Sequence, residues 1–241
     1  MYDIDPAEQA YWESKKEHID KDLWVIRNFL SQDEIDWLID YANEPEGWYS
    51  TMRSPYGGNT RNKFIGYDPL YDEEGNMILP TSESSHRFVK TKYHEWNLDA
   101  RIAGVVTPTF SGAGAFQSFF EIPDEQIIAE LGHNVDFAMD FHYEQDDDHT
   151  GLPPGREVQG DRNVMTANIT LYVNDDYDGG VLEFKNKDYV IEPEAGMLVN
   201  IPLYKEFEHR VTKVTNGNRH TLYGKSWLNA DKRHESTNLD C

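Results

Sequence analysis

Two residues of the C-terminal stretch EHRVTKVTNGNRHTLYGKSW could carry out chemistry together. His209 stands in the first predicted strand of this stretch and Arg219 in the second, and the pair Asn216-Gly217 between them is typical of a tight hairpin turn. Two adjacent strands would then direct an imidazole and a guanidinium into one cavity. An imidazole is a ligand for divalent metals, whereas a guanidinium forms a two-pronged pair with a carboxylate. The spacing therefore predicts a site for a metal ion and an acid.

The segments around these residues resemble the prolyl-4-hydroxylase-like branch of the Fe(II)/2-oxoglutarate-dependent dioxygenases. Five short segments follow one another in the family's order and at its usual spacing. They are YVND (172–175), DGG (178–180), PEAG (193–196), HRV (209–211) and GNR (217–219). The helix-forming segment after NFLSQDE is also similar to the family's N-terminal region, whereas residues 43–120 match nothing in it.

The resemblance implies an iron held by two histidines and one carboxylate. It implies that His209 is the second histidine and that Arg219 binds the distal carboxylate of 2-oxoglutarate. Tyr172 and Thr221 are implied as hydroxyl donors to the same carboxylate.

The first histidine and its carboxylate have two candidates. In His142-Tyr143-Glu144 the two-residue spacing puts both side chains on one face of a strand, with glutamate in place of the usual aspartate. In His149-Thr150-Gly151 glycine replaces the acid, which resembles the iron halogenases of the same superfamily, where the gap leaves room for chloride. The acidic and Gly/Pro-rich residues around His149 also fit a solvated loop. We favour His142 with Glu144, and His149 stays open.

The resemblance also implies the reaction. Fe(II), 2-oxoglutarate and O2 are the implied cofactors, with ascorbate as a further candidate, and the reaction is the hydroxylation of an unactivated C–H bond. The substrate would be a peptidyl proline, a free amino acid or another small metabolite. The alternatives are an iron halogenase that uses His149, and a jelly roll that only binds a ligand or assembles. A cupin-type hydrolase or isomerase would use the same histidines but would not need Arg219.

The elements that must position these residues change in character along the chain. Ser31 and Glu34 form a predicted capping box for a helix that follows a strand at 23–30. Further helices are predicted at 7–18 and 97–106, and a helix or short strand at 123–132. Beyond residue 134 the apolar period is two, which predicts strands at 135–143, 167–174, 181–184, 188–193, 196–202, 208–214 and 220–228.

This order predicts an α+β fold, with a double-stranded β-helix (a cupin-like jelly roll) as its core and N-terminal helices packed on the major sheet. We expect a single domain over 1–241, in which 1–133 support a jelly-roll core at 134–230. The aromatic segment 48–71 and the loop 145–162 are candidates for a substrate lid.

Composition limits the partners. Asp and Glu number 44 against 22 Lys and Arg, so the net charge is −22, which disfavours nucleic acid and anionic membranes. The one cysteine, Cys241, excludes disulfides within the chain and thiolate metal sites, so a metal must be held by His, Asp or Glu. The sequence shows neither a long apolar run nor a signal-peptide pattern, so we expect a soluble cytoplasmic protein.

Overall fold

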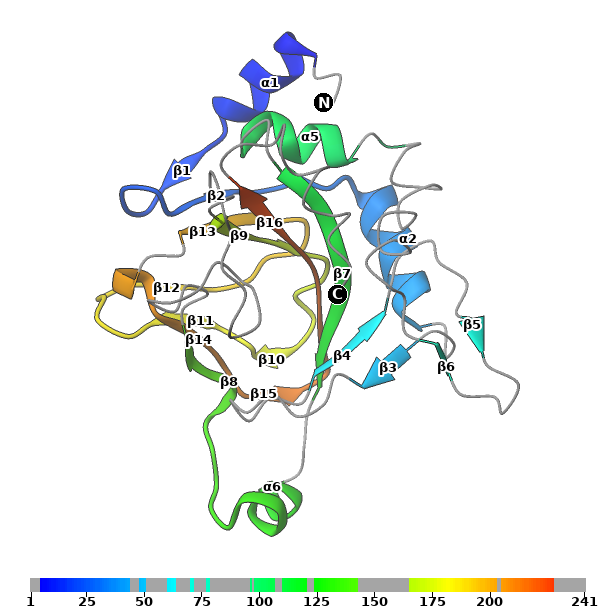
Figure 1. Cartoon of the computed structure of the whole chain (residues 1–241), viewed down its shortest axis with the longest axis vertical. Coiled ribbons are helices and arrows are strands. Elements are labelled where there is room, and N and C mark those ends of the chain that lie inside the picture. Colours follow the sequence, from blue (N-terminus) through cyan, green and yellow to red (C-terminus); the bar gives the residue numbers. More distant parts are fainter. Residues whose placement is uncertain are drawn as a thin grey trace, which may run out of the picture.

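Helices, a large antiparallel sheet and a small antiparallel sheet form three layers in the computed structural model of the chain (Figure 1). The structure describes residues 5–43, 48–50, 60–63, 70–71, 77–78, 96, 98–106, 110–120, 124–142, 165–202 and 205–227. The large sheet has eight strands and the small sheet has four, while β10 pairs with β15 and β5 with β6.

The large sheet has the strand order β1-β2-β13-β9-β16-β7-β4-β3. Its strands are β1 (Glu17–His18), β2 (Trp24–Ile26), β13 (Leu198–Pro202), β9 (Met165–Tyr172), β16 (Asn218–Trp227), β7 (Phe110–Phe120), β4 (Thr60–Lys63) and β3 (Trp48–Ser50). The order of the small sheet is β12-β11-β14-β8. Its strands are β12 (Val190–Ile191), β11 (Leu182–Phe184), β14 (His209–Thr212) and β8 (Phe137–His142). The two short pairs are β10 (Asp178–Gly179) with β15 (Val214–Asn216), and β5 (Leu70–Tyr71) with β6 (Met77–Ile78).

Four α-helices are described, together with a short 3₁₀ helix at Lys205–Phe207. They are α1 (Pro6–Glu13), α2 (Gln32–Asn43), α5 (Leu98–Val105) and α6 (Asp124–Leu131). The predicted capping box of α2 is confirmed, because the Glu34 carboxylate accepts hydrogen bonds from the Ser31 backbone N–H at 2.7 Å and from its hydroxyl at 2.9 Å. The segment predicted as a helix or a strand at 123–132 is the helix α6.

Two apolar cores lie on the two faces of the large sheet. Because side chains alternate along a strand, Leu171 and Leu198 face α2 and α5, whereas their neighbours Tyr172 and Val199 face the small sheet. The helix-side core also contains Leu38 of α2 and Ile102 of α5, both without exposed surface. Burying a side chain of this size contributes about 1.5–3 kcal/mol. The predicted α+β jelly roll, with N-terminal helices on the major sheet, is confirmed.

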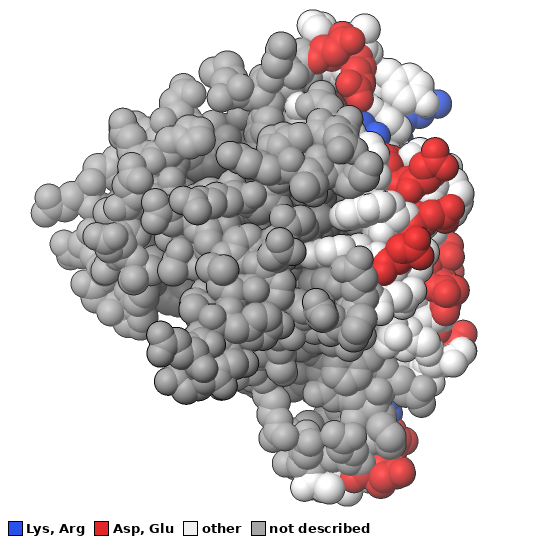
Figure 2. Space-filling model, turned by 90° about the vertical axis from the view of Figure 1, so that its right-hand side faces the viewer, with Lys and Arg blue, Asp and Glu red and all other residues white. Residues whose placement is uncertain are grey.

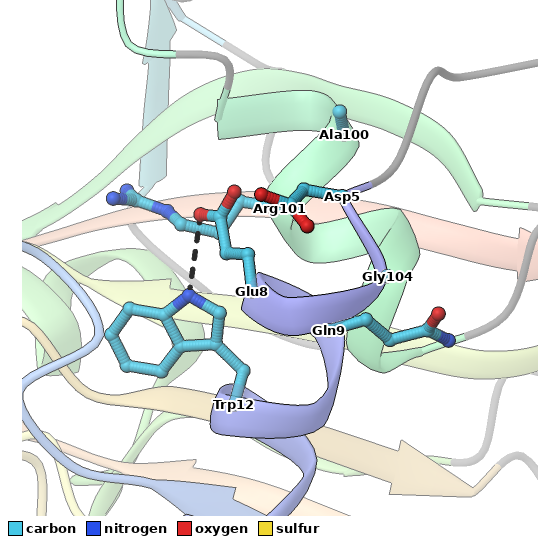
Figure 3. Close-up of a pocket in the computed structure, with 7 residues that line it drawn as sticks. All are labelled: Asp5, Glu8, Gln9, Trp12, Ala100, Arg101 and Gly104. Atoms are coloured by element: carbon cyan, nitrogen blue, oxygen red, sulfur yellow. Dashed lines mark hydrogen bonds between the residues drawn. The ribbon is translucent and has the colours of Figure 1, made fainter.

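The helix layer is tied together by a largely buried ion pair. Arg101 of α5 contacts the Glu34 carboxylate of α2 at 2.8 Å, and its guanidinium lies over the Phe29 ring, 4.9 Å from the centroid. Figure 3 shows the small pocket between α1 and α5, where Trp12 donates to Glu8 at 3.4 Å beside Arg101. This pocket lies on the helix side of the large sheet, away from the small sheet.

Acidic side chains dominate the described part of the surface in Figure 2, as the net charge of −22 requires. Among the described helices, none is long and apolar enough to cross a membrane.

The sequence reasoning missed β7, which occupies 110–120 and pairs with β16 along most of its length. Glycine and alanine in FSGAGAF, followed by the polar pair Gln117-Ser118 and the adjacent Phe119 and Phe120, show no apolar period of two. The strand matters for the site because Phe119 is the register partner of Arg219.

Candidate active site

Two histidines face each other across neighbouring strands of the small sheet. His142 is the last residue of β8 and His209 the first of β14, and the two are register partners. Their ring centroids lie 4.6 Å apart, and His209 is only 4 % exposed. The structure therefore brings together the two imidazoles that the sequence predicted as metal ligands.

Both imidazoles use Nδ1 for a hydrogen bond with the backbone carbonyl two residues earlier. Nδ1 of His142 lies 2.7 Å from the carbonyl oxygen of Asp140, and Nδ1 of His209 lies 2.9 Å from that of Phe207. Since a carbonyl only accepts, Nδ1 must carry the proton, and the lone pair of each neutral ring lies on Nε2. Metal-binding histidines are usually oriented in this way, by a backbone carbonyl or a carboxylate on the other nitrogen.

An irregularity in β8 sets the position of His142. Between the pairs His209–His142 and Val211–Met139, two residues of β8 stand opposite the single residue Arg210, which is a β-bulge. Arg210 fixes the outer side of this bulge, because its Nε donates to Glu183 at 2.7 Å and its guanidinium lies 4.8 Å from the Phe141 ring centroid. The bulge thus aligns His142 with His209 at the end of the strand.

The predicted carboxylate ligand cannot be placed. Glu144, two residues after His142, lies outside the described residues, and so do His149 and Gly151 of the alternative assignment. Within the described ranges, no group of three His, Cys, Asp or Glu side chains could hold a metal ion. The lid candidate 145–162 and most of the segment 48–71 also fall outside them.

Arg219 is a buried cation on the inner face of the large sheet. It is 3 % exposed, its guanidinium lies between the rings of Phe119 (4.5 Å) and Tyr172 (4.8 Å), and its Nη2 donates to the Tyr172 hydroxyl at 3.2 Å. No carboxylate in the described part of the chain forms an ion pair with it. A buried charge whose hydrogen bond reaches only a neutral phenol is well suited to binding an anion.

Tyr172 and Thr221, the two predicted hydroxyl donors, lie on the same strand as Arg219 or on the strand beside it. Thr221 is the register partner of Tyr172, and its two-residue spacing from Arg219 puts both side chains on the same face of β16. Tyr172 is fully buried and Thr221 is 1 % exposed. The three predicted carboxylate-binding residues are therefore neighbours.

The predicted hairpin between His209 and Arg219 is wrong. β14 belongs to the small sheet and β16 to the large one, because residues 214–216 pair with β10 and the chain then turns at Gly217, which has a φ of +76°. Both residues nevertheless border the same core between the sheets: His209 lies 6.1 Å from Phe184, ring to ring, and Arg219 stacks on Tyr172. The two groups approach this core from opposite sheets.

Asn174, which sequence reasoning did not single out, positions the start of β16. Its Oδ1 accepts from the His220 backbone N–H at 2.8 Å, and its Nδ2 donates to the Asn218 carbonyl at 2.8 Å. These two bonds bracket Arg219 and link it to the end of β9. Asn174 is only 6 % exposed. The signal in the sequence that could have identified it is its position in the YVND segment.

Residues 131–228 match the model of the 2OG-Fe(II) oxygenase superfamily. These residues form a 2OG-Fe(II) oxygenase domain. This match supports a dioxygenase of the oxidoreductase class, and the cofactors of the matched superfamily are Fe(II), 2-oxoglutarate and O2. The two histidines oriented by carbonyls, and the buried arginine that has no carboxylate partner among the described residues, fit these cofactors chemically.

A solved structure of low sequence identity has a similar fold. The chain is 12 % identical to a prolyl hydroxylase from Trichoplax adhaerens in complex with a hypoxia inducible factor oxygen degradation domain peptide fragment, with a TM-score of 0.53 over 95 % of this chain and 94 % of that one. It is 15 % identical to a Pseudomonas putida prolyl-4-hydroxylase, with a TM-score of 0.48 over 91 % of this chain and 98 % of that one. None of the curated proteins matches the sequence.

Proposed function

We propose that this oxygenase domain hydroxylates an unactivated C–H bond, with His142, His209 and Glu144 as iron ligands and Arg219, Tyr172 and Thr221 as the site for the distal carboxylate of 2-oxoglutarate. The observation that carries the proposal is the buried Arg219, which points into the core shared with the histidine pair and has no ion-pair partner among the described residues. A dicarboxylic acid that reaches from a metal to this guanidinium would coordinate the metal with one end and pair with Arg219 through the other.

Each side chain has a defined task in this proposal. The Nδ1 hydrogen bonds of His142 and His209 hold the rings so that both Nε2 lone pairs can serve a metal. Arg219 neutralises the distal carboxylate, and the Phe119 and Tyr172 rings keep its guanidinium in one plane and away from water. When bound, Fe(II) supplies the activation of O2, and the two histidines with one carboxylate leave positions for the cosubstrates.

The register pairing of His142 with His209 supports His142 as the first ligand, in preference to His149. With His142 in that role, Glu144 follows at the spacing that puts a carboxylate beside it. A carboxylate ligand supports hydroxylation, because halogenation requires that coordination position for the halide.

The substrate that we propose is a peptidyl proline, a free amino acid or another small metabolite. The net charge of −22 supports a neutral or cationic substrate and opposes nucleic acid. A proline-containing peptide is the first probe, since the fold relative from Trichoplax adhaerens was solved with a peptide.

The test is an anaerobic titration of the protein with Fe(II) and 2-oxoglutarate, followed by the weak visible charge-transfer band of the chelate. We expect the band in the wild type, and its loss in His142→Ala and His209→Ala. His18→Ala is the matched control, because His18 is exposed in β1 and far from the pair in sequence, and it should leave the band unchanged.

Absence of the band in the wild type would overturn the proposal and favour a jelly roll that only binds a ligand. A band that survives in His142→Ala but not in His149→Ala would assign the first ligand to His149. Product analysis with added chloride or bromide then separates hydroxylation from halogenation, because the product gains oxygen in the first case and halogen in the second.

A further inference from the structure

Tyr177 brings a second phenol to the guanidinium of Arg219. It lies in the turn between β9 and β10, within the segment DDYDGG, and its half-buried ring packs on the core between the two sheets. Sequence reasoning assigned this residue no role. Tyr172, in contrast, reaches Arg219 from within β9.

Two glycines allow the close approach of Tyr177 to Arg219. A Cβ on Gly180 would lie 2.8 Å from Cδ of Arg219 and 2.9 Å from Cε2 of Tyr177, closer than real side chains come. A Cβ on Gly217 would lie 3.1 Å from Cβ of Tyr177. Both glycines have positive φ values, +64° and +76°, which other residues rarely adopt. Glycine at 180 therefore lets the Tyr177 ring and the Arg219 side chain approach each other, and glycine at 217 leaves room for Cβ of Tyr177.

The phenol oxygen of Tyr177 is buried beside the Arg219 guanidinium, which can only donate to it, so the phenol proton meets no acceptor in the described part of the chain. Burial raises the pKa of the phenol, and the nearby positive charge of Arg219 offsets the rise only in part, so Tyr177 keeps its proton. A buried hydroxyl that cannot donate its proton is destabilising. Arg219 cannot accept this hydrogen bond, because a guanidinium has only donors.

One kind of ligand satisfies both groups. A carboxylate accepts up to four hydrogen bonds, so it can take the O–H of Tyr177 together with N–H groups of Arg219. Nε of Arg219 is also buried without a partner among the described residues. A neutral ligand could accept the hydrogen bond from the phenol, but it would leave the charge of the guanidinium uncompensated.

We propose that Tyr177 donates a hydrogen bond to the distal carboxylate of 2-oxoglutarate, so that Arg219 binds this carboxylate between two phenols, Tyr172 and Tyr177. This inference rests on the proposed role of Arg219 in cosubstrate binding. In this role Tyr177 positions 2-oxoglutarate and raises the affinity for it. The glycines of the DGG segment allow Tyr177 to approach Arg219.

The test measures ligand affinity on the whole chain loaded with Mn(II), by calorimetry, for the wild type and for Tyr177→Phe. We expect 2-oxoglutarate to bind about tenfold more weakly to Tyr177→Phe, because a hydrogen bond to a charged group is lost. Pyruvate, a 2-oxo acid that lacks the distal carboxylate, should bind both proteins equally. A purely structural role of Tyr177 would instead weaken the two ligands alike.

Tyr189→Phe is the matched control. Tyr189 is a second partly buried tyrosine packed on the same core, but its hydroxyl donates to Asp20 at 2.9 Å and takes no part in the Arg219 cluster. Its removal should leave the affinity for 2-oxoglutarate unchanged.

The outcomes separate the two proposals. If the wild type binds 2-oxoglutarate, Arg219→Leu abolishes binding and Tyr177→Phe binds as the wild type does, the role of Tyr177 is overturned and the proposed function stands. If the wild type does not bind 2-oxoglutarate, both are overturned. Equal weakening of 2-oxoglutarate and pyruvate in Tyr177→Phe also overturns the inference.

Discussion

Two arginines with little exposed surface, on opposite faces of the large sheet, have similar surroundings and different partners. Arg101 on the helix side lies over the Phe29 ring, and Arg219 on the inner side lies over the Phe119 and Tyr172 rings. In each, Nε is buried without a partner in the described residues. Only Arg101 has a carboxylate, Glu34 at 2.8 Å, whereas the described contacts of Arg219 reach a phenol.

The difference separates a structural charge from a binding charge. A buried arginine that is paired within the fold has its charge compensated in every state of the protein, so it can only stabilise or specify the structure. A buried arginine without such a partner keeps a desolvated positive charge, which favours an anionic ligand. Burial and stacking alone therefore do not mark a binding arginine, whereas the absence of a carboxylate partner in the described part of the chain supports the binding role that we propose for Arg219.

The largest effect is expected on the helix side. Glu34→Ala leaves Arg101 buried without its partner and removes the acceptor of the α2 capping box, so the free energy of unfolding should fall by about 3–5 kcal/mol. Urea unfolding measures this value. Glu8→Ala is the control, because Glu8 is only partly buried and its contact with Trp12 is long, at 3.4 Å, and it should change the value by less than about 1 kcal/mol. A similar loss in both variants would contradict the structural role of the ion pair.

Arg219→Leu should weaken ligand binding strongly and change the stability of the protein little, the reverse of what we expect for Glu34→Ala. The affinity for 2-oxoglutarate should fall by at least about 100-fold, because a buried charge pair with the ligand is lost. Without ligand, the free energy of unfolding should change by less than about 1 kcal/mol, since the lost stacking on the rings is offset by removal of an uncompensated charge.

Arg219→Lys sharpens this result, because it keeps the charge but loses the planar fork, and should give an intermediate affinity. If Arg219→Leu destabilises the protein without ligand as strongly as Glu34→Ala does, Arg219 has an internal partner and the comparison fails.

Asn174→Ala tests whether the alignment of β9 with β16 positions Arg219. It removes the hydrogen bonds to the backbone on both sides of Arg219, so we expect a loss of about 1–3 kcal/mol in stability and a several-fold weaker affinity for 2-oxoglutarate. Thermal unfolding and calorimetry measure the two effects. Asn216→Ala, which removes an exposed contact with Asp178, should change neither. A loss of stability with unaltered affinity would show that Asn174 does not position Arg219.

The smallest effect concerns a partly exposed charge, the Asp20 carboxylate, which extends the comparison to the surface. Hydrogen bonds from Lys187, the Lys21 backbone and Tyr189 lower the pKa of Asp20 to about 2 from the ordinary value of 3.8. Because the folded-state pKa is lowered, this contribution to stability is present above about pH 4 and is lost as the pH falls towards 2. Asp20→Asn should flatten the dependence of the melting temperature on pH in this window. An unchanged slope would mean that the cluster does not contribute to stability.

Much of this arrangement could be predicted from sequence because its signals are local. The capping box of α2, the period of two beyond residue 134 and the family segments identified the fold, His209, Arg219 and Tyr172. His142 could be named as a candidate because His-X-Glu spacing has a meaning on a strand.

The remaining features depend on contacts between distant segments. Asn216-Gly217 predicts a hairpin locally, but pairing of residues 214–216 with β10 sends the chain to the other sheet. The strand β7, whose Phe119 ring stacks on Arg219, is hidden by glycine and alanine and becomes evident only beside β16. The approach of Tyr177 to Arg219 likewise depends on glycines from two separate segments.

The most direct test of a single cofactor site is a crystal structure of the protein with Mn(II) and 2-oxoglutarate. We predict the metal on Nε2 of His142 and Nε2 of His209, with the distal carboxylate of 2-oxoglutarate on the Arg219 guanidinium. A metal bound away from the two histidines, or a distal carboxylate bound away from Arg219, would contradict the account.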